Sequence, residues 1–250
     1  MDRPEFTLNP TSCNPMEVIG SAISNLGQSA PLANRFQVGG CNGLGFKPDL
    51  TLSLKGGTKR SQHPALRSVI TYPTKGDYAN IAKAVVTLPA SEFIDQAHIG
   101  NPCIRPVFAE EKCPKISVLG RAKAWTPLLE KPEEGKVYFR SNGGERKLPD
   151  LVIALKGQIP VTLVGFVDSV HKKGSQVSRL RTTFAQVPDA PISKFVLELK
   201  GGKEGLLVNS GNLCQIPDKA VVKLTAQNGK TYDTQPAVAN SCGKASHKRR

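Results

Sequence analysis

Short segments in which apolar and polar residues alternate run through most of the chain. Between residues 148 and 242 they read DLVIALKG, IPVTLVGFVDSV, SRLRTTFAQV, SKFVLELK and KAVVKLTAQNGKTYDT. They are rich in Val, Ile, Leu, Thr and Phe and are separated by Gly, Pro and Asp, which is typical of strands and turns. QNGK contains Asn-Gly, a preferred hairpin turn. The pattern therefore predicts an all-β chain.

One stretch departs from this pattern. ASEFIDQAHI, residues 90–99, is the only good helical segment, and Ser91 is placed to cap it. Because the segment is short, we expect it to cross between sheets.

The predicted strands recur in the same order. The recurring patterns include P-D-L-x-x-x-L-K-G, I-x-K-x-V-x-x-L and N-x-C-x-x-P. The matched segments are 48–56 with 149–157, 66–73 with 180–188, 81–88 with 192–199, and 101–106 with 212–217. Self-similarity of this kind indicates tandem repeats.

A third, partial copy lies at the N-terminus, where CNPMEVIGSA (13–22) matches CPKISVLGRA (113–122). We therefore expect that the gene product, or its ancestor, extends further at this end. The predicted domains are a remnant of a preceding repeat (1–41), a first full repeat (42–147), a second full repeat (148–242) and a basic tail (243–250).

The number of strands in each repeat suggests its architecture. Seven or so short strands in about 100 residues indicate an immunoglobulin-like β-sandwich. The predicted fold class is accordingly all-β, with tandem immunoglobulin-like β-sandwich repeats stabilised by disulfides.

The chain has six cysteines, and neither CxxC nor a Cys/His spacing that suits zinc is present. An even number of widely spaced cysteines favours disulfides and an oxidising compartment. Cys13 and Cys41 are 28 positions apart, as are Cys214 and Cys242, so we predict these two bridges and, by remainder, Cys103–Cys113. The disulfide connectivity stays open. Cys214 aligns with Cys103 if the flanking residues are compared, but with Cys113 if the order of the predicted strands is compared.

A formal net charge of +14 favours an anionic partner such as an acidic glycan, a wall polymer or nucleic acid. A basic surface without that role is the alternative. Aromatic residues make up only 6% of the chain, too few for an obvious base-stacking platform. No apolar run of about 18 residues predicts a transmembrane helix, and MDRPEFTLNPTSC is not a signal peptide.

Glycine-rich stretches raise the question of nucleotide binding. ELKGGKEGLL (198–207) lacks the Ser or Thr and the following helix of a phosphate-binding loop, so we interpret it as a turn between strands. GGCNGLGF (39–46) lacks the helix of a dinucleotide fingerprint and reads as a linker beside a disulfide.

Candidate catalytic residues are few. Asp95 and His98 share a face if the segment around them is helical, but two ligands do not make a metal site. SVHK (169–172) matches S-x-x-K without the partner motifs of a serine β-lactamase, and it lies in a predicted hairpin loop. Trp125 could stack on a sugar, although a place in the sandwich core is the favoured interpretation. We predict no enzyme, no cofactor and no metal site.

Five strings, ANIAKAVVTLPASEFIDQAHIGNPC, GRAKAWTPLLEKPEEGKVYFRS, KLPDLVIALKGQIPV, RTTFAQVPDAPISKFVLELKGGKEGLLVNSGNLC and AQNGKTYDTQPA, resemble the C-terminal repeat region of large secreted bacterial proteins. The resemblance covers nearly the whole chain. It implies an exported, disulfide-bearing array of β-sandwiches and transfers no functional residue.

The expected function is a non-enzymatic extracellular or cell-surface module with a structural, spacer or adhesion role, whose partners include neighbouring repeats of a longer chain. The alternative is a basic module that binds an anionic polymer.

Overall fold

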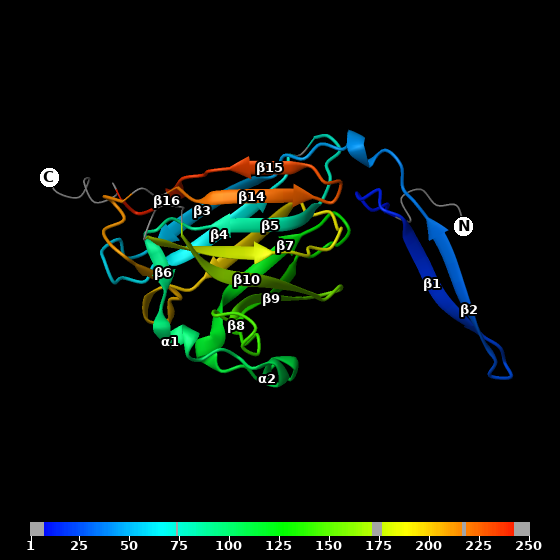
Figure 1. The fold of residues 1–250 in the computed structure, drawn as a ribbon, viewed down its shortest axis with the longest axis horizontal. Helices are drawn as coiled ribbons and strands as arrows, with labels where there is room; N and C mark the ends of the chain where they lie inside the picture. The colour runs from blue at the N-terminus through cyan, green and yellow to red at the C-terminus, as the bar shows by residue number, and fades with distance from the viewer. Residues whose placement is uncertain (1–7, 74, 172–176, 217–218, 243–250) are drawn as a thin grey trace.

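Strands form most of the molecule, as the alternating pattern predicts. The computed structural model of the chain describes residues 8–73, 75–171, 177–216 and 219–242 (Figure 1). The strands are β1 (Met16–Ile23), β2 (Ser29–Phe36), β3 (Asp49–Lys55), β4 (Ala65–Thr71), β5 (Ile81–Thr87), β6 (Glu92–Ile94), β7 (Val118–Trp125), β8 (Glu133–Arg140), β9 (Asp150–Lys156), β10 (Val161–His171), β11 (Ser178–Phe184), β12 (Lys194–Leu199), β13 (Leu207–Asn209), β14 (Val221–Ala226), β15 (Thr231–Thr234) and β16 (Val238–Ala239).

Helices are few and short. They are α1 (Gln96–Ile99), α2 (Arg105–Ala109) and the 3-10 turns η1 (Cys41–Gly43), η2 (Lys115–Ser117) and η3 (Gly202–Glu204). Within the described part of the chain, none of the helices has the length and apolar character needed to cross a membrane.

The helix predicted over residues 90–99 is wrong in its first half. Residues 92–94 form β6, which pairs with β13, so the backbone there is extended. The helix begins only after Asp95, whose side chain accepts a hydrogen bond from the Ala97 amide at 2.8 Å. Ser91 is not the cap, because its hydroxyl donates to Glu92 instead. A strand partner more than 100 residues away overrides the local helical pattern.

One curled sheet of 12 strands makes up the body, in the order β15-β14-β5-β11-β10-β9-β8-β7-β12-β4-β3-β16. The two predicted repeats do not form two separate sheets. Instead, β5 of the first repeat lies between β14 and β11 of the second, and β12 of the second lies between β7 and β4 of the first. The expected pair of immunoglobulin-like sandwiches is therefore not confirmed. The alternation of apolar and polar residues shows which face of a strand is buried. It does not determine which other strand pairs with it.

The inner faces of the curled sheet pack against each other to form the core. Leu119, Val137, Phe139, Ile153 and Leu224 are at most 1% exposed. They come from both predicted repeats, so a single core holds the body together. Burial of such side chains is the main favourable contribution to folding.

The three disulfides join the pairs that the spacing predicts. Cys13 bonds to Cys41, Cys103 to Cys113 and Cys214 to Cys242, so all six cysteines are bridged. The Cys103–Cys113 bridge closes the loop that carries α2.

Both turn predictions are confirmed. Residues 200–206 connect β12 to β13 through η3. The Asn-Gly pair at 228–229 joins β14 to β15, and Gly229 has a φ of 82°, which glycine adopts without steric cost.

Within the remnant predicted over residues 1–41, residues 16–36 form an arm, defined here as the β1–β2 hairpin. It projects away from the body (Figure 1). Nearly every one of its residues is exposed.

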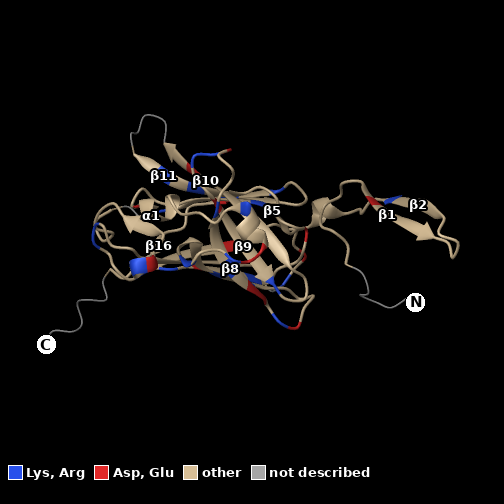
Figure 2. Cartoon of the chain, turned by 90° about the horizontal axis from the view of Figure 1, so that it is seen from below, with Lys and Arg blue, Asp and Glu red and all other residues tan. Residues whose placement is uncertain are grey.

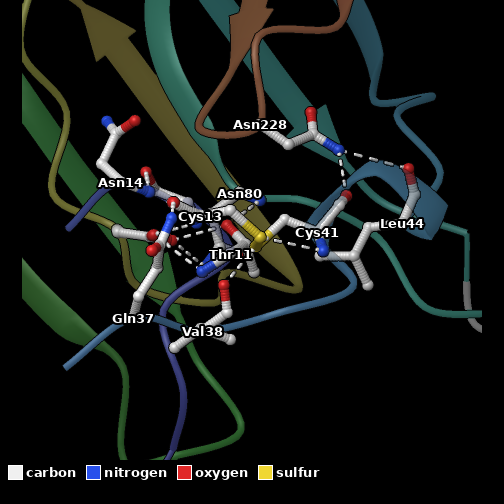
Figure 3. Close-up of a disulfide and its surroundings, with 11 residues drawn as sticks. Thr11, Cys13, Asn14, Gln37, Val38, Cys41, Leu44, Asn80 and Asn228 are labelled. Carbon is white, nitrogen blue, oxygen red and sulfur yellow. Dashed lines mark hydrogen bonds between the residues drawn. A yellow bond between two sulfur atoms is a disulfide. The ribbon is translucent and has the colours of Figure 1, made fainter.

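The base of this arm is attached to the body (Figure 3). The Cys13–Cys41 bridge joins the two ends of the arm to each other. The Thr11 hydroxyl donates to Asp189 at 2.7 Å and the Asn228 amide donates to the Cys41 carbonyl at 2.8 Å, and these contacts attach the base to the body.

Candidate anion-binding groove

Asp95 and His98 do not form a joint site. Asp95 Oδ2 lies 2.7 Å from Nε2 of His63, a residue that the sequence did not single out. The hydrogen bond from His63, followed by that from Ala97, holds the pKa of Asp95 below its ordinary value. His98 is buried, and its Nδ1 lies 3.0 Å from the Ile116 carbonyl. Among the described residues, no group of three or more His, Cys, Asp or Glu could hold a metal ion.

Ser169 lies on β10 and its hydroxyl is hydrogen-bonded to that of Ser178 on β11. The loop prediction is therefore wrong for residues 169–171, which belong to β10 and pair with β11, although the two strands do form an antiparallel hairpin. Lys172, the other member of the S-x-x-K motif, lies outside the described residues.

Trp125 is not in the core. It ends β7 half-buried, with the Lys194 ammonium 5.2 Å from its ring centre. The core interpretation is wrong because alternation along β7 sends Ala122 and Ala124 inward.

The interior of the curled sheet contains a cavity of about 140 Å³. Aliphatic and aromatic side chains line it, and Ser68 and Thr182 supply its only hydroxyl groups. No charged side chain is among its lining residues. A cavity of this size and character is a packing space that could hold at most a small apolar molecule.

A concentration of charged side chains lies on the outer face of the same sheet. A groove of about 430 Å³ crosses β3, β4, β12, β7 and β8. Its lining includes five cations and one carboxylate. These are Lys55, Arg67, Arg121, Lys136, Lys200 and Glu198.

Four of these side chains form one row across the sheet. Arg67 of β4 is directly opposite Glu198 of β12, which is opposite Arg121 of β7. Arg121 is in turn opposite Lys136 of β8. Neighbouring strands lie about 4.8 Å apart, so the row extends over roughly 14 Å. We call these four residues the charged row.

Glu198 fixes the two arginines of the charged row. Its Oε1 accepts from Arg67 Nε at 3.2 Å and its Oε2 accepts from Arg121 Nε at 2.7 Å. The hydrogen bond from Arg121 is the main reason that the pKa of Glu198 lies below its ordinary value. Each of these contacts uses only Nε, so each guanidinium retains Nη donors for another acceptor.

The lysines of the groove differ in whether a carboxylate neutralises their charge. Lys200 pairs with Glu204 at 2.7 Å. Lys55 and Lys136 are exposed, and within the described part of the chain neither has a carboxylate partner. The groove therefore carries excess positive charge that is accessible from solvent.

The net charge of the chain predicts a basic surface but does not reveal this groove. Arg67, Arg121, Lys136 and Glu198 each occupy an outward position in an alternating segment, which is the signal that was present. Their convergence depends on β12 inserting between β4 and β7, and this exchange is not visible in the alternation.

Comparison of the chain with models of protein families, with curated proteins and with solved structures found no match.

Proposed function

We propose that this chain is an exported, non-enzymatic β-module that adheres to an acidic glycan or wall polymer through the groove. The charged row is the observation that carries this proposal, because it places three cations on adjacent strands around one carboxylate. An extended polyanion lying across the strands would meet several of them at once. Partial neutralisation by Glu198 keeps the arginines ordered before the ligand arrives.

The chemistry of the groove favours a glycan or wall polymer over single-stranded nucleic acid. None of the residues that line it is aromatic. Single-stranded nucleic acids are usually held by stacking of their bases on aromatic side chains, in addition to a basic channel.

Three disulfides support an extracellular location. Such bridges persist in oxidising compartments and are rare where thiols are kept reduced. All six cysteines are committed to them, including those that hold the loop around α2 and the base of the arm.

The order of strands also supports descent from tandem repeats. Apart from the two-residue β16 at the edge beside β3, one half of the sheet reads β3-β4-β12-β7-β8, and the other reads β9-β10-β11-β5-β14-β15. By the sequence matches, β3 corresponds to β9, β4 to β11 and β5 to β12. The halves are therefore related by exchange of β5 and β12, with β10 as an addition.

The test is binding of the oxidised full chain to heparin, to polyuronate and to a single-stranded DNA of similar length, at 50–300 mM salt. We expect binding to the two glycans whose affinity falls with salt. The double variant Arg121→Gln, Lys136→Gln should weaken it and make log K fall less steeply with log salt, since two cations that release counterions from the polymer are lost.

The matched control is Lys83→Gln, Lys223→Gln on the other half of the sheet. Both lysines are exposed on β5 and β14, and the substitution removes the same charge. Equal losses in both variants would show that net charge alone attracts the polymer. Absence of glycan binding at 50 mM salt would refute the proposal, and stronger binding of DNA would redirect it to nucleic acid.

A further inference from the structure

The arm holds nearly half of the exposed large apolar side chains of the described residues. Six large apolar side chains of residues 16–36 are exposed, out of 13 in the described chain. They are Val18, Ile19, Ile23, Leu26, Leu32 and Phe36. A two-stranded ribbon with both faces in water is marginally stable, whereas three or more strands with an apolar face are stable. An arm of this composition therefore needs additional strands.

The counterpart of β1 in the body is β7, and β7 shows how an additional strand, β12, packs beside it. The match between 13–22 and 113–122 places Gly20 where β7 has Gly120 and Ile19 where β7 has Leu119. A Cβ at Gly120 would lie 1.9 Å from the Glu198 carbonyl oxygen of β12, whereas nothing lies within 4 Å of a Cβ at Gly20. Leu119 is fully buried, but Ile19 is 76% exposed. The arm has kept the residues that receive a neighbouring strand, and among the described residues no strand other than β2 pairs with β1.

The two edges of the arm differ. Ser24 N donates to Gln28 O at the turn, so Ser24 and Gln28 form a hydrogen-bonded pair. Alternation along the antiparallel ladder then directs the backbone groups of Ile19, Ser21 and Ile23 away from β2. β7 behaves in the same way, since the Leu119 carbonyl accepts from Lys200 N just beyond β12.

Proline blocks the opposite edge. Pro31 is the partner of Ser21, so its nitrogen faces outward from β2 and offers no donor there. β1 contains no proline. The arm therefore presents one open edge, along β1, and one closed edge, along β2.

Charge indicates what can approach the open edge. Residues 8–40 contain only Glu17 and Arg35 as charged residues, and these two face each other across the hairpin. Figure 2 shows the arm nearly free of charged positions, in contrast to the body. The arm is thus neutral in a chain of net charge +14, and two arms can meet without the repulsion that two bodies would experience.

We propose that the arm is a dimerisation element, in which β1 pairs antiparallel with β1 of a second copy of this chain. In the register centred on Gly20, every backbone N–H and C=O group of β1 that points away from β2 forms a hydrogen bond with the other copy. This register places Ile19 opposite Ser21 of the other copy and Glu17 opposite Ile23, so like charges do not face each other. Gly20 meets its own counterpart on the two-fold axis, where Cα atoms approach to about 4.5 Å.

The resulting sheet, β2-β1-β1-β2, has four strands and closes at two copies. Both of its outer edges are β2 strands blocked by Pro31, which prevents a third copy from adding. None of the arm residues lines the groove, so dimerisation and polymer binding can be tested separately.

Sedimentation equilibrium of the oxidised full chain at 1–200 µM tests the proposal, with a monomer–dimer equilibrium as the expected result. Ser21→Pro removes the outward donor at the centre of the new pairing. It should raise the dimer dissociation constant on the order of 10- to 100-fold, since two hydrogen bonds are lost by symmetry. Pro31→Ser opens the second edge and should produce species larger than dimers.

Crosslinking checks the register. Gly20→Cys should form a disulfide between copies upon mild oxidation, because its Cα separation suits such a bond. Leu26→Cys, at the exposed tip of the arm, is the matched control and should stay unlinked, since antiparallel pairing places the two tips far apart. A wild-type chain that is monomeric at 200 µM, a dimer unaffected by Ser21→Pro, or equal crosslinking of the two cysteine variants would each overturn the proposal.

Discussion

At the scale of single residues, a glycine and an arginine pair determine how the groove is built. Gly120 allows the backbone of β12 to approach β7 closely, and this approach brings Glu198 opposite Arg121. Glu198 then holds Arg67 as well. The close approach and the charged row therefore depend on the same pairing of β7 with β12.

Gly120→Ala is expected to destabilise the body, because the added methyl group would meet the Glu198 carbonyl oxygen at 1.9 Å. Overpacking of this kind costs about 1–3 kcal/mol of unfolding free energy. Gly39→Ala is the control, at an exposed glycine after β2 where the added methyl group meets open space. Urea unfolding of the two variants measures the difference, and equal effects would contradict the role assigned to Gly120.

At the scale of elements, the segment from β6 to α1 shows how one carboxylate organises a loop. Asp95 caps α1 through Ala97 and holds His63, which precedes β4, through its second oxygen. His63 in turn accepts at its carbonyl from Gly202 N, so the turn between β12 and β13 is attached to the same point. The three segments are distant in sequence and are connected here by polar contacts.

Asp95→Ala should lower the unfolding free energy by about 1 kcal/mol at pH 7, the usual cost of losing an N-cap. Because hydrogen bonds depress its folded-state pKa, ionised Asp95 stabilises the protein above its ordinary pKa of 3.8 and loses this effect as pH falls through the folded-state value. The difference from wild type should therefore shrink below pH 3.8.

Urea unfolding from pH 7 to pH 2.5 measures this prediction. Asp77→Ala, at an exposed aspartate, serves as the control and should have little effect at either pH. An Asp95→Ala deficit that persists undiminished at pH 2.5 would show that the carboxylate charge is not what stabilises α1.

At the scale of the whole molecule, the exchange of β5 and β12 turns two predicted domains into one body. β8 and β9 are also hydrogen-bonded neighbours, although the predicted boundary at 147/148 falls between them. The arm lies outside this body and contributes a separate surface (Figure 1). The body thus carries the groove, and the arm carries the proposed dimer contact.

The body should accordingly unfold in one cooperative transition, because each half of its sheet contains a strand of the other. Calorimetry of the oxidised chain should give a calorimetric enthalpy equal to the van't Hoff enthalpy. Residues 42–147 expressed alone should not fold, since β5 would lack both β11 and β14. Two separate transitions, or a stably folded fragment, would contradict this prediction.

The sequence by itself determined the strand-rich character of the chain, the Asn-Gly hairpin and the turn at 200–206, and its cysteine spacing predicted the three disulfide pairs while leaving their connectivity open. These features depend on local backbone preference and on the spacing of the repeats, and both can be read from the order of the residues. The helix start at Asp95 was missed because β6 pairs with β13, and Trp125 was misplaced because it lies at the end of β7 rather than inside the sheet.

Only the tertiary structure decided which strands are neighbours. Arg67, Glu198, Arg121 and Lys136 are separated by up to 131 residues and meet because β12 inserts between β4 and β7. The isolation of the arm is likewise a tertiary result, since the residues of β1 match those of β7, which is enclosed in the sheet. The alternation of apolar and polar residues shows that a strand has an inner and an outer face. Which strand pairs with its edge depends on packing across the whole chain.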